Sequence, residues 1–316
     1  MLSRWRAGKL KLTTVKTKVE NQICAKTCYM KLKIGVAGLL PSDWRKIDVN
    51  VAQAVRRAGF SGVSVVIDKP LLADKADLLR VKQSLVAAGV KCAQANGFYE
   101  CLIHKDPALR AEGIRGHQAL IRIGSVLAAE VVYIRPGSHN PKGHWWHHAE
   151  NHNQWSFDTL VDSCRQLAQV AEGEGMTLAI EGHVSSTLDT PQRVRDLLDA
   201  VASPALKFSM DPVNFTGTVT DVHDTSRILN ALFDLLGKDT VILHAKDCNI
   251  QDGHVVHIDE VLLGTGSMNY DIILPRMLKE CPNAYVLIEH LSDDKVPLAR
   301  AAIGKIAQRL GIEFDA

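Results

Sequence analysis

Four residues with metal-binding side chains each stand at the end of a short, strongly apolar run. The runs are Ala-Ile-Glu181, Ser-Met-Asp211, Ile-Leu-His244 and Leu-Ile-Glu289. Three carboxylates and an imidazole brought together in a buried place would repel one another and lose solvation, and a divalent cation relieves both costs. Three oxygen donors with one nitrogen suit Mn²⁺, Mg²⁺, Co²⁺ or Zn²⁺, and ligand type alone does not select among these ions.

Each of the four residues also has an ordinary structural explanation. An Asp at a strand end often caps the next helix, and a strand-end His is often only hydrogen-bonded. The same feature at four strand ends favours a shared role. We therefore predict one metal site formed by all four side chains.

These side chains can meet only if their strands lie in one parallel sheet. From Met30 onward, short β-branched runs alternate with longer helical patterns. Continuous apolar strands between helices indicate a parallel sheet that is buried on both faces. The expected strands are 32–37, 62–67, 90–96, 130–134, 177–181, 206–210, 240–244 and 284–289. The expected helices include about 47–58, 75–88, 157–174 and 295–309, and one that opens with Asp106 as N-cap and Pro107 as its first residue.

Eight strand–helix repeats predict an α/β fold that closes into a (β/α)8 TIM barrel, although an open doubly wound sheet has the same pattern. In a barrel, the C-terminal ends of the strands converge on one face, where active sites lie. No linker or change of composition divides residues 30–316. We predict that these residues form a single domain.

The bulk composition is that of an ordinary globular protein. The chain has 316 residues, of which 46% are hydrophobic, which is enough for one large core. Residues 1–29 hold seven Lys or Arg and one acid, so with a net charge of +2 for the whole chain the remainder carries −4. The main body therefore has no general attraction for nucleic acid. No apolar run approaches the length of a membrane span.

Seven scattered cysteines, an odd number, indicate free thiols in a reducing compartment and predict a cytoplasmic protein. The basic first 29 residues lack the apolar centre of a secretory signal. A transit peptide and a basic arm both fit this composition. We interpret residues 1–29 as a basic N-terminal extension, because Met30 directly precedes the first expected strand.

The stretch after the fourth expected strand is rich in histidine and tryptophan. Five histidines lie between positions 139 and 152. Their spacing matches no zinc pattern, so a solvated lid is favoured over a second metal site. Arg135 and His139 emerge directly from the strand and are predicted substrate contacts. Trp146 is predicted to close over a substrate, with packing against a neighbouring subunit as the alternative.

Five segments of the sequence together resemble the xylose isomerase-like TIM barrels. This superfamily contains sugar epimerases, inosose dehydratase, dehydroshikimate dehydratase and endonuclease IV. The resemblance covers about residues 32–310, and its Glu, Asp, His and Glu match the family's metal ligands in order and strand placement. It rests on LAIEGH (178–183), MDPVNF (210–215), HAKDC (244–248), GTGSMNY (264–270) and VLIEH (286–290).

The resemblance implies a metal-dependent isomerase or epimerase of a small sugar or sugar-like hydroxyketone. Glu181 and Glu289 would be the acid/base pair that moves protons on the two sides of the substrate. The metal would hold the carbonyl and the adjacent hydroxyl oxygens and stabilise an enediolate. The resemblance also implies a small carbohydrate-like partner and allows a homo-oligomer.

Further residues of these motifs are predicted substrate contacts. His183 shares the face of Glu181 by strand alternation. Asn214 stands where some family members have a metal ligand or a catalytic His, and an amide keeps only the hydrogen bonding. Lys246 is expected to pair with a substrate carboxylate, and Asp247 to orient loops or a substrate hydroxyl. Between positions 263 and 267, two close glycines could offer backbone N–H groups to an anion, although a tight turn is the commoner explanation.

Three other functions fit parts of the pattern. A dehydratase of inosose or 3-dehydroshikimate starts with the same proton removal and would use the same residues, with Arg135 or Lys246 available for a carboxylate. An endonuclease IV-like enzyme needs three zinc ions and more strand-end histidines than this chain offers. A non-catalytic barrel is disfavoured by the intact set of four ligands.

Overall fold

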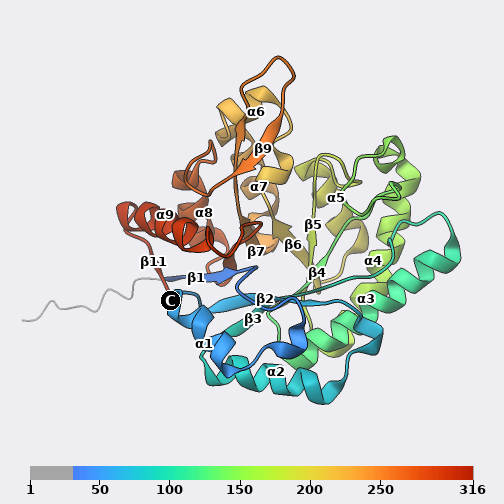
Figure 1. Ribbon diagram of the computed structural model, residues 1–316. Helices are drawn as coiled ribbons and strands as arrows, with labels where there is room; N and C mark the ends of the chain where they lie inside the picture. Colours follow the sequence, from blue (N-terminus) through green and yellow to red (C-terminus); the bar gives the residue numbers. More distant parts are fainter. Residues whose placement is uncertain (1–30, 316) are drawn as a thin grey trace, which may run out of the picture.

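Eight parallel strands form a closed ring in the computed structural model, which describes residues 31–315. The ring order follows the chain, and the eighth ring strand, β10, pairs back with β1 (Figure 1). The predicted (β/α)8 TIM barrel with a single domain is confirmed. The ring strands are β1 (Lys31–Val36), β2 (Gly62–Ile67), β3 (Lys91–Gly97), β4 (Val131–Ile134), β5 (Leu178–Glu181), β6 (Leu206–Met210), β7 (Thr240–Ala245) and β10 (Tyr285–Ile288).

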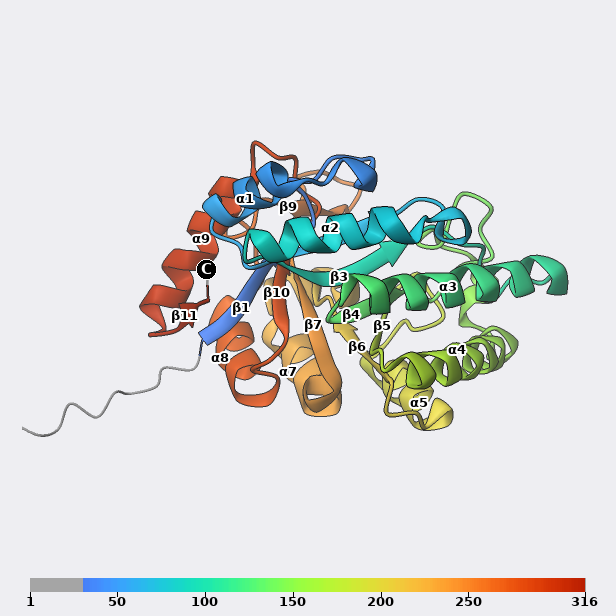
Figure 2. The same ribbon diagram turned by 90° about the horizontal axis from the view of Figure 1, so that it is seen from below.

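Helices surround the ring, as the two views of the ribbon show (Figures 1 and 2). Asp106 caps α3 by accepting the N–H of Ala108, as the Asp-Pro pair predicts, and α4 ends at Gly175 in the left-handed conformation. The helices are α1 (Val49–Arg57), α2 (Lys75–Ala87), α3 (Pro107–Leu127), α4 (Gln154–Glu174), α5 (Pro191–Val201), α6 (Val219–His223), α7 (Ser226–Leu236), α8 (Tyr270–Glu280) and α9 (Val296–Arg309). Short 3₁₀ turns lie at Trp44–Lys46, Pro70–Leu72, Ala149–His152, Val213–Phe215 and Gly237–Asp239.

Two apolar clusters hold the barrel. The larger lies between the strands and the helices, and the smaller comprises Ala93, Val131, Ala179, Ile242, Tyr285 and Leu287. Ala179, Ile242 and Leu287 each precede a predicted metal ligand by two positions, so strand alternation directs them to the ligands' side of the sheet, the barrel interior. Gly62 makes room for Tyr285, because a Cβ there would lie 2.5 Å from the ring. The barrel interior is therefore filled below the face that carries the ligands.

Two small elements lie outside the expected repeats. β8 (Asp247–Ile250) and β9 (Ile258–Val261) form an antiparallel hairpin that projects from the barrel beyond β7 (Figure 1). β11 (Glu313–Phe314) pairs in parallel with the start of β1. The predicted extension, residues 1–29, lies outside the described residues. None of the described helices has both the length and the apolar character that crossing a membrane requires.

Candidate active site

The four predicted ligands meet at the C-terminal ends of the strands. Glu181 is the last residue of β5, and His244 is the next-to-last residue of β7. Asp211 and Glu289 directly follow β6 and β10. One ligand atom from each residue lies within 4.8 Å of the others. Three of the four side chains are almost completely buried. All ring strands run in the same direction, so their C-terminal ends lie on one face of the barrel. A polar residue at the end of each apolar strand therefore reaches that face.

His244 is oriented by hydrogen bonding on the side away from the cluster. Its Nε2 lies 2.9 Å from Oε1 of Gln94, and the amide of Gln94 donates to the hydroxyl of Ser64 at 3.2 Å. Its Nδ1 lies 3.1 Å from Oε1 of Glu181 and 3.3 Å from Oε1 of Glu289. The Gln94 oxygen needs a proton on Nε2, which leaves Nδ1 as the nitrogen that faces the other ligands.

The surroundings of Asp211 suit a metal ligand. Both carboxylate oxygens are buried and have no hydrogen-bond partner among the described residues. The ammonium of Lys246 lies 2.7 Å from Oδ2, so it supplies charge without the alignment of a hydrogen bond. The same ammonium lies 3.0 Å from Oε1 of Glu289. Three carboxylates with one aligned imidazole fit a divalent cation, because a bound ion would satisfy the bare oxygens.

The two glutamates differ in their electrostatic surroundings. Burial raises the pKa of Glu181 to about 7, with the nearby Asp211 adding to the effect. The pKa of Glu289 falls to about 2, because the positive charges of His244 and Lys246 outweigh its burial. Burial thus favours the protonated form of Glu181, whereas the neighbouring cations favour the ionised form of Glu289.

Glu181 is held by two further polar groups. The hydroxyl of Tyr133 donates to Oε2, and Nδ2 of Asn214 donates to Oε1 at 3.0 Å. Asn214 lies in the short turn after β6, and Tyr133 is part of β4. These bonds fix the plane of the carboxylate that faces the cluster.

A cavity of about 320 Å³ opens beside Glu181 and Glu289, two of the four predicted ligands. Its volume is within the range of roughly 300–1,000 Å³ that is usual for small-molecule sites. Four predicted substrate contacts, Arg135, His183, Asn214 and Lys246, line it together with Glu181 and Glu289. Its other lining residues are Gln94, Asn96, Tyr133, Trp145, Glu260 and His290.

None of these six residues is among the predicted site residues, although three sequence patterns point to four of them. Gln94 and Asn96 are polar residues two positions apart in an otherwise apolar strand, which places both on one face. Tyr133 lies two positions before the predicted contact Arg135, so strand alternation places both on one face in the same way. Trp145 precedes the predicted Trp146. Glu260 belongs to the β8–β9 hairpin, which the pattern of strand–helix repeats does not predict.

Three predicted contacts lie elsewhere. Trp146 is 51% exposed, and Trp145 lines the cavity in its place, with its ring centroid 5.9 Å from that of His183. His139 lines a neighbouring cavity of about 540 Å³ and has Nε2 at 2.7 Å from the hydroxyl of Ser156. His139 and Trp146 lie in the loop after β4, where side chains no longer alternate between two faces. The regular alternation that places residues of a strand therefore does not apply to them.

Asp247 orients a loop. Its carboxylate accepts the backbone N–H groups of Cys248, Gly264, Gly266 and Met268 at 2.9–3.0 Å. The glycine-rich turn does expose N–H groups to an anion, and that anion is a side chain of the same protein.

The histidine-rich loop forms no metal cluster in the part of the chain that the structure describes. Within residues 31–315, the group at Glu181 is the one set of three or more such side chains that converge. His144 instead places Nε2 at 3.1 Å from the carbonyl of Tyr99. Burial, with Arg135 nearby, lowers its pKa to about 4.

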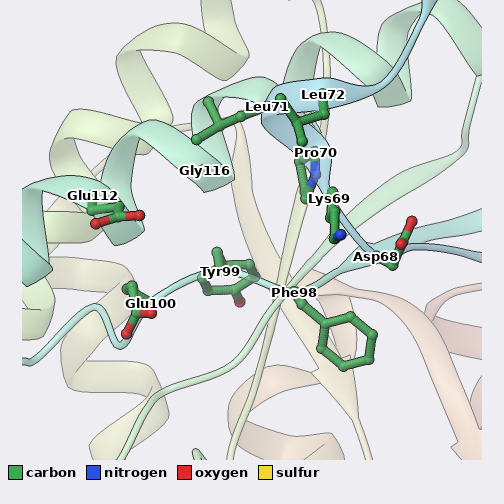
Figure 3. Close-up of a pocket in the computed structure, with 10 residues that line it drawn as sticks. All are labelled: Asp68, Lys69, Pro70, Leu71, Leu72, Phe98, Tyr99, Glu100, Glu112 and Gly116. Atoms are coloured by element: carbon green, nitrogen blue, oxygen red, sulfur yellow. The ribbon is translucent and has the colours of Figure 1, made fainter.

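A further cavity of about 420 Å³ lies between the β2–α2 and β3–α3 connections (Figure 3). Its walls include the apolar side chains of Leu71, Leu72 and Phe98, all of which are more than half exposed. It contains none of the four ligands.

The closed ring of parallel strands with convergent acidic and imidazole groups at its C-terminal face defines a (β/α)8 barrel with a candidate divalent-metal site. The family model described as xylose isomerase-like TIM barrel matches residues 52–309. The chain belongs to this family, as its motifs predict.

Solved structures share this fold at low sequence identity. A 3-keto-D-glucoside 4-epimerase from E. coli is 16% identical with a TM-score of 0.64, covering 88% of this chain and 99% of its own. A xylose isomerase-like TIM barrel protein from Mycobacterium smegmatis in complex with magnesium is 16% identical with a TM-score of 0.67 (88% and 96% covered). A D-psicose 3-epimerase with D-tagatose from Clostridium cellulolyticum H10 is 15% identical with a TM-score of 0.67 (89% and 100% covered). No curated protein matches the chain.

Proposed function

We propose that this protein is a divalent-metal-dependent isomerase or epimerase of a small sugar or sugar-like hydroxyketone. The observation that carries the proposal is the convergence of Glu181, Asp211, His244 and Glu289 within 4.8 Å, with Glu181 and Glu289 lining a cavity of sugar-compatible size. The sugar epimerases among the structural neighbours support the substrate class. The magnesium complex of another neighbour supports a divalent cation, and we propose Mn²⁺, Mg²⁺, Co²⁺ or Zn²⁺, because three oxygens and one nitrogen suit all four ions.

The chemistry proposed is proton transfer beside a carbonyl. A bound divalent cation would polarise the carbonyl and stabilise the negative charge of an enediolate. One glutamate removes a proton from the carbon next to the carbonyl, and the other returns a proton on the opposite side. Glu181 and Glu289 are the two carboxylates that line the cavity, so they form the proposed acid/base pair.

The remaining residues of the cavity have roles in binding. Asn214 and Tyr133 hold the carboxylate of Glu181 in one orientation. His183 and Trp145 offer a hydrogen-bonding ring and an apolar face to a polyhydroxy substrate. Lys246 stabilises the acidic cluster through Asp211 and Glu289.

The test combines metal content with proton exchange. The purified protein is expected to hold one divalent ion per chain and to incorporate solvent deuterium next to the carbonyl of a ketose, measured by NMR over a panel of ketoses. Glu289→Gln should abolish exchange, with a fall of at least about a thousandfold, because it removes one of the two acid/base groups. Glu181→Ala should lose the ion.

Glu112→Gln is the matched control, because it makes the same carboxyl-to-amide change on an exposed helical residue outside the cavity. Wild-type exchange rates in Glu289→Gln would remove that residue from the mechanism. A protein without affinity for divalent metals would refute the proposed function. Loss of water from inosose or 3-dehydroshikimate, without ketose exchange, would identify a dehydratase instead.

A further inference from the structure

Arg135 brings an unneutralised positive charge to the cavity. It directly follows β4, is 8% exposed and lines the cavity with Glu181 and Glu289. None of the ion pairs among residues 31–315 includes its guanidinium. Burying a charge without a counter-charge is unfavourable unless a ligand supplies one.

Neutral oxygens hold the guanidinium in place. One terminal nitrogen donates to the carbonyl of Gly97 at 2.7 Å, and the other donates to Oδ1 of Asn96 at 2.8 Å. The backbone N–H of Arg135 donates to the hydroxyl of Tyr99 at 2.9 Å. The side chain has five N–H donors, so donors remain for a ligand after these bonds are made.

Three aromatic rings surround the same group. The guanidinium carbon lies 5.7 Å from the ring centre of Phe98, 5.5 Å from that of Tyr99 and 5.6 Å from that of Tyr133. Figure 3 shows Phe98 and Tyr99 leaving neighbouring positions in different directions. The rings restrict the motion of the side chain and shield it from water, yet they carry no net charge.

The other positive groups of the cavity have acidic partners. Lys246 contacts Asp211, Glu289 and Glu260. His290 has Nδ1 at 3.0 Å from Oε1 of Glu260. Among the described residues, Arg135 is thus the positively charged side chain of this cavity that has no acidic partner and can bind an anionic ligand.

Burial and the positive charge of Arg135 together lower the pKa of two neighbouring histidines. Burial, assisted by this positive charge, lowers the pKa of His117 to about 3 and that of His144 to about 4. Both rings are therefore neutral near pH 7 and add no further charge beside the guanidinium.

We propose that Arg135 forms an anion subsite, so that the substrate carries a carboxylate or a phosphate in addition to its hydroxyketone. A planar guanidinium with free donors binds either group through paired hydrogen bonds. The inference rests on the proposed function, because it places the reacting carbons at Glu181 and Glu289 and the anionic end at Arg135. Both ends border the same cavity.

Three probes with one six-carbon skeleton test the subsite: D-glucuronate, D-glucose 6-phosphate and the neutral D-glucose. Binding is measured by calorimetry on the Mn²⁺-loaded protein. At least one anionic probe should bind tenfold or more tighter than D-glucose, and the better of the two identifies the anion. Arg135→Gln should remove this preference, whereas Arg135→Lys should retain part of it. Metal content and circular dichroism of each variant confirm that it is folded.

Equal binding of all three probes to the wild type would overturn the subsite, as would a preference that persists in Arg135→Gln. Deuterium exchange on the same preparations separates this failure from that of the proposed function. Exchange into neutral ketoses without any preference for anions would exclude the subsite and leave the isomerase. An Arg135-dependent preference in a protein that binds no metal would exclude the isomerase and leave the subsite.

Discussion

His244 has its two ring nitrogens in different surroundings, and this difference decides how the residue can act. Nε2 faces the oxygen of Gln94, whose amide NH₂ donates to the hydroxyl of Ser64, and Nδ1 faces Glu181. An outer partner of this kind fixes the tautomer and the ring plane of a metal-binding histidine. Gln94 is thus expected to contribute to metal binding without touching the ion.

Gln94→Leu should weaken metal binding about 10- to 100-fold, because Nε2 loses its acceptor and the ring loses its orientation. Mn²⁺ titration monitored by electron paramagnetic resonance measures the change. Gln166→Leu makes the same substitution on an exposed position of α4 and should leave the affinity unchanged. Equal affinities for all three proteins would show that Gln94 does not orient the ligand.

Metal affinity should rise with pH. Although burial opposes its charged form, the carboxylates of Glu289 and Glu181 raise the pKa of His244 to about 9, and the pKa of Glu181 is about 7. Both groups must lose their protons before they bind a cation, so protons compete below these values. We expect the affinity to rise about tenfold per pH unit from 7 to 9, more steeply below 7, and to level off above 9. Calorimetry in buffers of different ionisation enthalpy measures the protons released; a pH-independent affinity would contradict the prediction.

The hairpin after β7 is organised by one carboxylate. Asp247 accepts four backbone N–H groups, two of them from the glycines at 264 and 266. At Gly266 a Cβ would lie 2.3 Å from Oδ1 of Asp247, so only glycine permits this approach. The hairpin in turn carries Glu260 to the cavity.

Asp247→Asn should lower the free energy of unfolding by about 2–3 kcal/mol, because an amide NH₂ turned toward N–H donors leaves buried groups unpaired. Urea unfolding followed by circular dichroism measures the loss. Asp259→Asn, in the exposed part of the same hairpin, should change stability by less than about 0.5 kcal/mol. A neutral result at position 247 would mean that the loop holds its shape without this acceptor.

The barrel strands could be predicted because each carries its own signal. The runs 62–67 and 206–210 coincide with β2 and β6, since each run is rich in apolar residues and turns flank it on both sides. The hairpin could not be predicted in the same way. Its strands are short, and only Asp247 and Cys248 of their residues are buried, so no apolar pattern marks them. The convergence of the four residues at strand ends was predictable from topology, whereas Trp145 and Glu260 reach the cavity through loops whose direction depends on tertiary packing.

At the scale of the molecule, the ring closes near both termini of the described chain. β11 pairs with β1, and the side chain of Asp315 accepts the N–H of Ile34 at 3.2 Å and the hydroxyl of Ser61 at 2.8 Å. A chain that lacks residues 1–29 should keep its thermal midpoint within about 2 °C if those residues are an extension. A chain that stops after Ile312 loses β11 and should melt several degrees lower. Calorimetry of both proteins is the test, and a large loss on N-terminal deletion would make residues 1–29 part of the domain.

The pairing of β1 with β10 has a consequence for synthesis on the ribosome. Lys33 lies opposite Tyr285, so most of the chain separates the two partners. At roughly 5–20 residues per second, β1 waits on the order of 10–50 s for the strand that covers its free edge. During that time the nascent protein is an open sheet with an uncovered edge, which is the form most exposed to association with other chains. Translation speed and chaperone supply are therefore expected to limit the yield of soluble protein more than the stability of the finished barrel does.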